Sequence, residues 1–389
     1  MLSVTLLGSG GTIPTNVRPL TSLYVHHDYY RILVDCGEGT QMTAKRLGVS
    51  LSGVSFILLT HLHADHFLGL PGLLLTYAND GRKEPIFIVG PIGVQKYLQE
   101  LLGKFNIPFP INFLEITGAR ESIQLDSLII ECFKVKHNCL CYGYNFIVNR
   151  ACKFDVEKAE KSGIPKPAWG LLSKDVTIEV NGNDVTGEQL IGANRKGLKV
   201  SYATDTGYFQ QLAEEVKNAD LLFLEGMYTQ EPEVAKDRTT YHLTAKQAAM
   251  VARDACVRHL CLTHFSPKVK QPELCLPDIT EIFKNTVCGY PGCHYDLNAS
   301  GDIMGNTLDE IEVDAKTFRG ISTGMYNFLV TTKKDYFAVN QQIRIVKRNV
   351  IDDLVFSISS ITARILEVKM PIPNMKILVI IPEVLYEKN

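Results

Sequence analysis

Three histidines and one aspartate lie within six residues of this sequence, in the segment Thr60-His61-Leu62-His63-Ala64-Asp65-His66. Imidazole nitrogen and carboxylate oxygen are both ligands of zinc in proteins. The alternative is a polar turn in solvent, but the whole chain has only ten histidines, and three in one turn favour a metal site. A catalytic metal usually takes about three protein ligands and keeps one position open. Four candidate ligands therefore predict two metals that share further ligands.

The elements around this segment must bring it to the edge of a sheet. The apolar run 54–59 predicts a strand before it, and residues 68–74 predict the start of a helix behind it. Polar side chains also end other predicted strands or begin a predicted helix, and these are His137, Asp205, Glu225, His242 and His264. Each alone has a structural alternative, such as a helix cap for Asp205. Their recurrence predicts the rim of side chains that α/β sheets use for active sites.

The composition is that of an ordinary globular protein. With 389 residues, 46% of them hydrophobic and 21% charged, the chain can form one large domain with additions. We expect no signal peptide and no membrane span, because no apolar run approaches the roughly 20 residues that cross a bilayer. Ten cysteines without a secretion signal predict reduced thiols in the cytoplasm. The lack of a Cys-x-x-Cys pair argues against structural zinc on thiolates.

The formal net charge is −2, which gives no support for nucleic-acid binding by itself. The charge is unevenly distributed, because residues 315–389 carry a net +5 and residues 1–314 a net −7. A polyanionic partner would therefore meet local basic patches and the metals, and no global attractive field.

Strands alternate with helices through most of the chain, for example a strand over 85–90 and a helix over 94–102, which predicts a layered α/β domain. Residues 149–199 hold many charged residues, six glycines and the only tryptophan, and they predict a surface insertion. The last part of the chain contains the β-like runs Gln342–Val346, Leu354–Ser359, Ile365–Met370 and Lys376–Ile381. We expect a catalytic domain over 1–314 that contains the insertion, and a small β-rich extension over 315–389.

The segment Thr60–His66 matches the His-x-His-x-Asp-His signature of the metallo-β-lactamase superfamily. Further segments resemble the ribonuclease Z family, the tRNA 3′-processing endonucleases of that superfamily, in the same order over roughly residues 1–290. These segments are Leu7–Pro14, Asp35–Gln41, Gly69–Leu74, His137 with Tyr142-Gly143-Tyr144, Asp205-Thr206, His242-x-Thr244 and Leu262–Ser266. The resemblance implies an α/β fold of the αββα sandwich type, two zinc ions per subunit, precursor tRNA as substrate and a homodimer.

The resemblance also implies a ligand set for each zinc ion. One zinc would be held by His61, His63 and His137. The other would be held by Asp65, His66 and His264, and Asp205 would bridge the two ions.

A further group implied by the resemblance would act on the reacting phosphodiester. Glu225 and His242 match residues that act together near the leaving group, and His242 is the candidate general acid. Asp65 would orient the attacking hydroxide as well as bind zinc. The implied products are a tRNA that ends in 3′-OH and a trailer with a 5′-phosphate.

Substrate binding would depend on basic residues. The resemblance assigns residues 149–199 to an arm that grips the tRNA elbow, and the candidate contacts are Arg18, Lys166 and Lys268. Three positions depart from the family pattern: Asn16 replaces a common Lys, Lys268 a common Arg, and Lys166 a common Gly. Lys in place of Arg loses bidentate recognition of phosphate.

The resemblance, together with these residues, implies a zinc-dependent endoribonuclease that removes the 3′ trailer of precursor tRNA. A zinc phosphodiesterase for small or cyclic phosphodiesters is the alternative. The departures at Asn16 and Lys268 favour it, and the arm disfavours it. An RNA-binding protein with a decayed site is a third hypothesis. All seven ligands and both acid groups are present, so this hypothesis ranks last.

Overall fold

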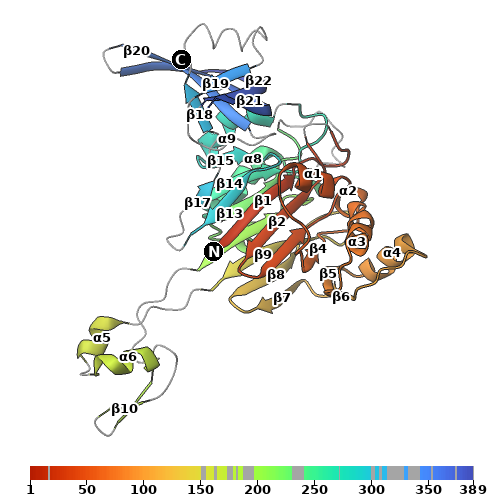
Figure 1. The fold of residues 1–389 in the computed structure, drawn as a ribbon, viewed down its shortest axis with the longest axis vertical. Coiled ribbons are helices and arrows are strands. Elements are labelled where there is room, and N and C mark those ends of the chain that lie inside the picture. Colours follow the sequence, from red (N-terminus) through yellow and green to blue (C-terminus); the bar gives the residue numbers. More distant parts are fainter. Residues whose placement is uncertain are drawn as a thin grey trace.

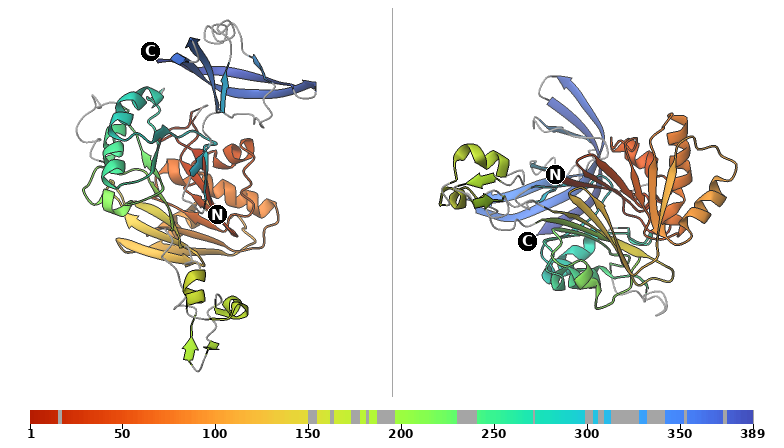
Figure 2. Two further views of the ribbon diagram at one scale, coloured as in Figure 1. Left: turned by 90° about the vertical axis from the view of Figure 1, so that its left-hand side faces the viewer. Right: turned by 90° about the horizontal axis from the view of Figure 1, so that it is seen from below.

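The structure of this chain is a computed structural model. It describes residues 1–15, 18–149, 155–161, 164–172, 178–180, 183–186, 197–229, 241–270 and 272–298, and the strands 303–305, 309–312, 328–331, 342–351, 354–372 and 375–388. Two large β-sheets pack face to face, and helices cover the outer face of each sheet (Figures 1 and 2). The predicted αββα sandwich is confirmed.

The first sheet holds the N-terminal strands. In spatial order its described strands are β17 (Ile303–Gly305), β16 (His294–Leu297), β1 (Leu2–Gly8), β2 (Ser22–His27), β3 (Tyr30–Val34), β4 (Phe56–Leu58), β5 (Ile86–Pro91) and β6 (Ile111–Ile116). β1, β2 and β3 are antiparallel neighbours, whereas β3 to β6 run parallel. Parallel neighbours need crossover connections, which accounts for the helices between these strands.

The second sheet carries the later candidate ligands. Its described strands, in spatial order, are β15 (Thr286–Cys288), β14 (His259–Thr263), β13 (Leu221–Glu225), β12 (Leu198–Ala203), β9 (Tyr142–Val148), β8 (Leu128–Lys134) and β7 (Arg120–Leu125). β12, β13 and β14 run parallel. β8 runs in the same direction, because β8 and β12 are both antiparallel to β9. The carboxyl ends of β8, β12, β13 and β14 therefore meet at one edge.

Three apolar layers hold the sandwich together. Buried side chains of both sheets, such as Leu6, Val25, Phe146 and Phe223, fill the central layer. The first sheet buries its outer face against α1 (Thr40–Arg46), α2 (Ala64–Phe67), α3 (Gly69–Asn79) and α4 (Val94–Leu102). The second buries its outer face against α7 (Leu212–Glu215), α8 (Ala245–Asp254) and α9 (Leu276–Ile282). Each fully buried large apolar side chain contributes roughly 1.5–3 kcal/mol, so these layers hold the strand ends rigidly in place.

The insertion extends away from the sandwich, opposite the C-terminal sheet (Figure 1 and the left view of Figure 2). Its described elements are α5 (Val156–Lys161), α6 (Lys166–Leu172), β10 (Ile178–Val180) and β11 (Asn183–Val185). Ala159, Ile164 and Leu172 form a small apolar core of their own, with Trp169 packed against it. The insertion is thus a separate structural unit on the sandwich.

The C-terminal extension forms its own sheet. In spatial order the described strands are β18 (Asp309–Glu312), β20 (Gln342–Ile351), β21 (Leu354–Ile372), β22 (Met375–Lys388) and β19 (Phe328–Thr331). Two predicted runs, 354–359 and 365–370, are one strand, because register shifts let β21 continue between them. The change from the first sheet to this one falls between Gly305 and Asp309, before residue 314. Among the described helices, none is both long and apolar enough to cross a membrane.

Candidate metal centre

The histidine segment occupies the turn between β4 and α2. His61 is buried directly beyond the end of β4, and His63 is the N-cap residue of α2. The short α2 then presents Asp65 and His66 from its first turn, with His66 fully buried. The turn after β4 and the first turn of α2 thus bring four polar side chains to the same edge of the sandwich.

Three imidazoles form a first cluster, which we call site 1 and which consists of His61, His63 and His137. The Nδ1 atom of His63 lies 2.9 Å from Nε2 of His61 and 3.3 Å from Nε2 of His137. His137 reaches this position because it follows β8, at the edge where the strands of the second sheet end. The sandwich therefore brings a ligand from the second sheet against two from the first.

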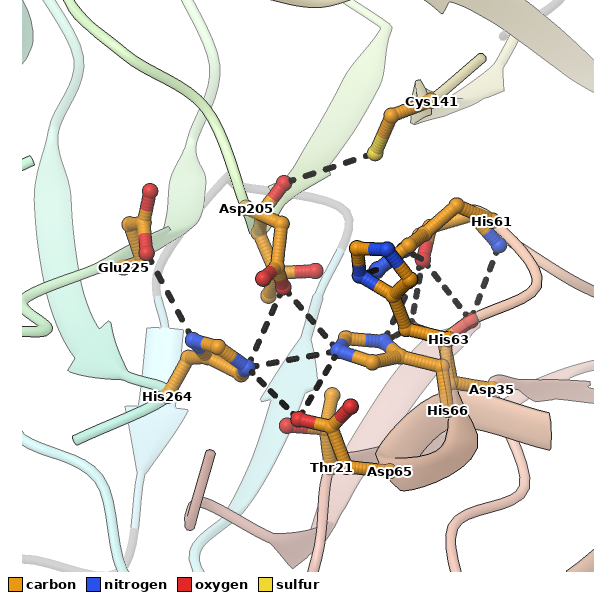
Figure 3. A network of polar contacts seen from close by, with 12 residues as sticks. Thr21, Asp35, His61, His63, Asp65, His66, Cys141, Asp205, Glu225 and His264 are labelled. Carbon is orange, nitrogen blue, oxygen red and sulfur yellow. Dashed lines mark hydrogen bonds and ion pairs between the residues drawn. The ribbon is translucent and has the colours of Figure 1, made fainter. Parts of the chain in front are cut away.

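A second cluster, site 2, consists of Asp65, His66 and His264. The Nε2 atoms of His66 and His264 lie 3.2 Å apart. Oδ2 of Asp65 is 3.6 Å from the first of these nitrogens and 3.5 Å from the second. Figure 3 shows these three side chains converging from opposite sides of the sandwich.

Asp205 lies between the two sites. Its Oδ2 atom is 3.0 Å from Nε2 of His66 and 3.1 Å from Nε2 of His264 (Figure 3). Its Oδ1 atom is 4.0 Å from Nε2 of His137. One carboxylate can therefore reach both sites, as a bridging ligand does. The alternative interpretation of Asp205 as a helix cap is wrong. The next described helix after Asp205 is α7, which begins only at Leu212.

The donor atoms fit metal ions better than they fit one another. Nδ1 of His63 can share a proton with only one of its two nitrogen neighbours, so hydrogen bonds cannot satisfy site 1. The buried Oδ2 of Asp205 has no hydrogen-bond partner among the described residues, although two imidazoles face it. A buried carboxylate oxygen without a donor is costly unless a cation binds it. Nitrogen and oxygen donors at these spacings can hold divalent metal.

Electrostatics keep the bridging carboxylate ionised. Burial alone raises the pKa of the Asp205 carboxyl, but the imidazoles of His264 and His66 outweigh it and hold this pKa well below its usual range. Burial also disfavours the charged form of His264, yet the Asp205 carboxylate raises the pKa of that imidazole to about 10. Asp205 is thus held as a carboxylate, which is the form that binds a metal ion.

Three residues at the same edge have a strained backbone conformation. Asp35, Asp205 and His264 have φ values of 56°, 49° and 55°, in the left-handed region that residues other than glycine rarely adopt. Such positions cost on the order of 1–3 kcal/mol each and persist only where the surroundings impose them. Gly11 supplies space for one of them, because a Cβ there would lie 2.6 Å from Cε1 of His264. The backbone is therefore strained at residues whose side chains belong to the two sites or contact them.

Residues behind the two clusters hold the candidate ligands in position. Asp35 accepts hydrogen bonds from the backbone N–H and the hydroxyl of Thr60, and its Oδ2 lies 2.9 Å from Nδ1 of His66. The backbone N–H of Thr12 donates to Oδ2 of Asp65 over 2.6 Å. Asp35 directly follows β3 inside a segment that resembles ribonuclease Z, but its contact with His66 was not predicted. The only sign of such a role in the sequence was an Asp directly after an apolar strand.

Glu225 and His242 form a pair beside the metal sites. Nδ1 of His242 lies 2.9 Å from Oε2 of Glu225. Oε1 of Glu225 accepts hydrogen bonds from the backbone N–H groups of Thr206 and Leu243, which fix the carboxylate. Burial lowers the pKa of the His242 imidazole, but the Glu225 carboxylate more than compensates and raises it above its ordinary value. Glu225 thus fixes the Nδ1 side of His242 and favours the protonated imidazole.

The candidate substrate contacts are dispersed. Arg18 is buried, donates to the backbone carbonyl of Val269, and lies over the ring of Phe265 at 5.8 Å. Lys268 is exposed close to this point in the chain, whereas Lys166 lies in the insertion. Nζ of Lys166 is 3.6 Å from Glu160 and 5.5 Å from the centre of the Trp169 ring. Asn16 lies outside the described residues.

Comparisons with known proteins agree with this geometry. The model of the metallo-β-lactamase superfamily matches residues 15–144, and that of the β-lactamase superfamily domain matches residues 180–265. The chain is 39% identical over 293 residues to ribonuclease Z of Lachnospira eligens, covering 75% of this chain and 96% of that protein. It is 40% identical over 291 residues to ribonuclease Z of Clostridium kluyveri, covering 74% and 96%.

A solved structure shows the same fold. The short form of human tRNase Z matches with a TM-score of 0.55 at 20% identity, covering 76% of this chain and 99% of the human chain. The unmatched part of this chain is consistent with the separate C-terminal sheet. With the ligands of both sites gathered at one edge and relatives matched over nearly their full length, this chain belongs to the ribonuclease Z family of metal-dependent nucleases.

Proposed function

We propose that this protein is a zinc-dependent endoribonuclease that removes the 3′ trailer of precursor tRNA and leaves a 3′-OH on the tRNA. The observation that carries the proposal is the meeting of seven ligand side chains with a separate carboxylate–imidazole pair at one edge of the sandwich. The ligands account for a metal-assisted hydrolysis, and the pair accounts for protonation of a leaving group. Relatives named ribonuclease Z supply the substrate class.

We propose zinc as the metal, with one ion in site 1 and one in site 2. Three imidazole nitrogens at one site and a mixed imidazole–carboxylate set at the other are typical of zinc. When bound, the two ions would supply an acidified water as nucleophile and positive charge beside the phosphate oxygens. Asp205 would join the two sites, because each of its oxygens faces a different one.

The protein's own groups would control the proton transfers. Asp65 is fixed by the Thr12 N–H, so its carboxylate can bind metal and orient the attacking water. His242 would donate its Nε2 proton to the departing 3′-oxygen, since Glu225 already holds its Nδ1 side. Glu225 acts through His242 and is a positioning residue. Hydrolysis then yields the 3′-OH of the tRNA and a 5′-phosphate on the trailer.

The insertion over 149–199 would bind the tRNA at a distance from the metal sites. It extends from the sandwich and has a core of its own, so it can grip a bulky substrate without disturbing the ligands. Lys166 is engaged with Glu160 and Trp169, and would bind phosphate only by leaving these contacts. Lys268 is the exposed basic candidate on the sandwich.

The test compares two substrates in the same preparation. The zinc-loaded protein is incubated with a tRNA precursor that carries a 3′ trailer, and separately with bis-p-nitrophenyl phosphate. We expect cleavage of the precursor at the tRNA end. Cleavage of the small ester alone would contradict the tRNA proposal and favour the small phosphodiesterase, which the burial of Arg18 also favours. Cleavage of neither substrate by protein that holds zinc would favour a binding protein.

Deletion of residues 153–190 separates binding from chemistry. We expect the deletion to slow cleavage of the precursor strongly and to leave hydrolysis of bis-p-nitrophenyl phosphate unchanged. Equal loss of both reactions, with zinc content retained, would show that the insertion does more than bind tRNA.

We also propose that the protein is a homodimer in the cytoplasm. The dimer is expected from the resemblance to the ribonuclease Z family. Met42 on α1 and Leu68 at the start of α3 are 59% and 48% exposed, so both positions are open to substitution in a test of it. The nine cysteines in the described part of the chain are free thiols, which suits a reducing compartment. Light scattering should give the mass of two chains at micromolar concentration, and a Met42→Lys, Leu68→Lys double variant should give one. A monomeric wild-type protein would contradict the dimer.

A further inference from the structure

Cys139 lies beside site 1, two residues after His137. It is exposed, whereas its neighbour Cys141 is fully buried with Sγ directed at the carbonyl of Thr204 over 3.9 Å. Cys141 therefore packs as a structural thiol. Cys139 has no comparable role in the core, and it stands in the same short connection between β8 and β9 that delivers His137.

The Cys139 sulfur lies near one ring nitrogen of each histidine in site 1. Its Sγ and one ring nitrogen each of His61, His63 and His137 all lie within 4.8 Å of one another. A tetrahedral zinc with bonds of about 2.0–2.1 Å to nitrogen and about 2.3 Å to sulfur places its four donors about 3.3–3.7 Å apart. A change of rotamer at an exposed cysteine can close this difference.

We propose that Cys139 is a fourth ligand of the metal in site 1. This ligand goes beyond the seven that the family pattern implies, and it presupposes the metal centre of the proposed function. On metal binding the thiol would lose its proton to solvent and the sulfur would form a bond to the ion, without any redox change. Three nitrogens and one thiolate make four donors, the number that zinc takes in tetrahedral geometry.

Cys139 and Asp205 would then be alternative donors to the ion in site 1. Oδ2 of Asp205 faces site 2, and its Oδ1 is still 4.0 Å from His137. A thiolate in the fourth position would hold the ion in a resting state, and the substrate would have to displace the sulfur to reach the metal. A soft thiolate also favours zinc or cadmium over manganese at this site.

Cobalt spectroscopy tests the bond directly. The full chain is freed of metal, loaded with Co²⁺ and examined for a sulfur-to-cobalt charge-transfer band in the near ultraviolet, which nitrogen and oxygen ligands do not give. We expect the band in the wild type, its loss in Cys139→Ser, and its retention in Cys256→Ser. Cys256 is the matched control, because it is the other exposed cysteine among the described residues. Cobalt that binds without the band, or a band that Cys139→Ser retains, would overturn the proposal.

Alkylation of the wild-type protein gives a second measurement that does not depend on a variant folding. Iodoacetamide should modify both Cys139 and Cys256 in the metal-free protein, and zinc should protect Cys139 alone, as read by peptide mass spectrometry. Equal modification of Cys139 with and without zinc would overturn its role as a ligand. A chain that binds neither zinc nor cobalt would overturn the metal centre as well, whereas failure to cleave tRNA would not affect this result.

Discussion

The two proposed metal sites differ in how their candidate ligands are supported. In site 2, Nδ1 of His66 lies 2.9 Å from the Asp35 carboxylate and Nδ1 of His264 lies 3.5 Å from the Glu225 carboxylate. In site 1, Nδ1 of His61 faces the Thr60 hydroxyl, and Nδ1 of His137 faces a backbone carbonyl at 3.3 Å. A carboxylate behind a ligating imidazole raises its basicity more than a neutral group does.

This difference indicates that the sites have separate tasks. Site 2 is built from fully buried imidazoles with charged partners, so it should bind its metal first and hold it more tightly. Site 1 includes the half-buried His63, and its other two imidazoles have neutral partners, so its metal should exchange more readily. The active centre would then consist of one fixed ion and one that is filled or released with conditions.

Substitution of Asp205, the ligand that the two sites share, should weaken metal binding at both sites and so remove the difference in their affinities. Asp205→Asn removes the charge that faces both of them, so we expect both ions to bind weakly. The loss of turnover should exceed the roughly 100-fold effects typical of outer residues. Metal analysis and precursor cleavage measure it, with Asp254→Asn as a surface control that loses only a contact with Arg253. Full zinc content in Asp205→Asn would contradict the bridging role.

Removal of the candidate general acid His242 should slow the reaction without changing metal binding at either site. His242→Ala leaves all seven ligands in place, so zinc content should match that of the wild type. Turnover should fall by roughly 10²- to 10⁴-fold, the range for a positioned general acid. If the variant loses zinc, His242 is a ligand and the assignment is wrong.

Substitution of the outer carboxylate should weaken site 2 alone. Asp35→Asn keeps an acceptor for the Thr60 N–H but removes the charge behind His66. We expect the tighter zinc affinity to fall by roughly 10- to 100-fold and the weaker one to stay constant. Competition with a chelator measures both steps, and Asp126→Asn, at an exposed partner of Tyr30, is the control. An equal loss at both sites would remove the distinction between them.

The smallest effect is expected in the pH profile of Glu225→Gln. The acid form of His242 is lost as the pH rises through its pKa, and the Glu225 carboxylate raises that pKa. Without this charge the pKa falls, so the alkaline limb of the rate profile should move to lower pH. An unchanged alkaline limb at constant zinc content would show that His242 does not supply the proton.

Local pattern was sufficient for much of the sandwich and for the ligands. The predicted helix over 94–102 has the same bounds as α4, and the predicted strand ends at Asp205, Glu225 and His264 lie together because their strands run parallel. Periodicity shows which elements exist, and the parallel arrangement then places their carboxyl ends at one edge.

The remaining features depend on contacts between distant segments, which local pattern does not contain. Asp35 supports His66 across 31 positions, and nothing beside Asp35 in the sequence indicates that partner. Arg18 was predicted as a substrate contact, but its guanidinium is buried against Phe265 and Val269, some 250 positions away. Cys139 was not predicted as a ligand, whereas the fold places it among histidines.

The most direct measurement is cleavage of precursor tRNA during stepwise addition of zinc to the metal-free protein. If site 2 fills first and chemistry needs both ions, the first equivalent of zinc per chain should bind without activity. Activity should then rise with the second equivalent, with 3′-OH on the tRNA product. If activity instead rises in proportion to the first equivalent of zinc and reaches its maximum at one equivalent, the reaction does not need both ions. That result would contradict the proposal that two sites of unequal affinity act together.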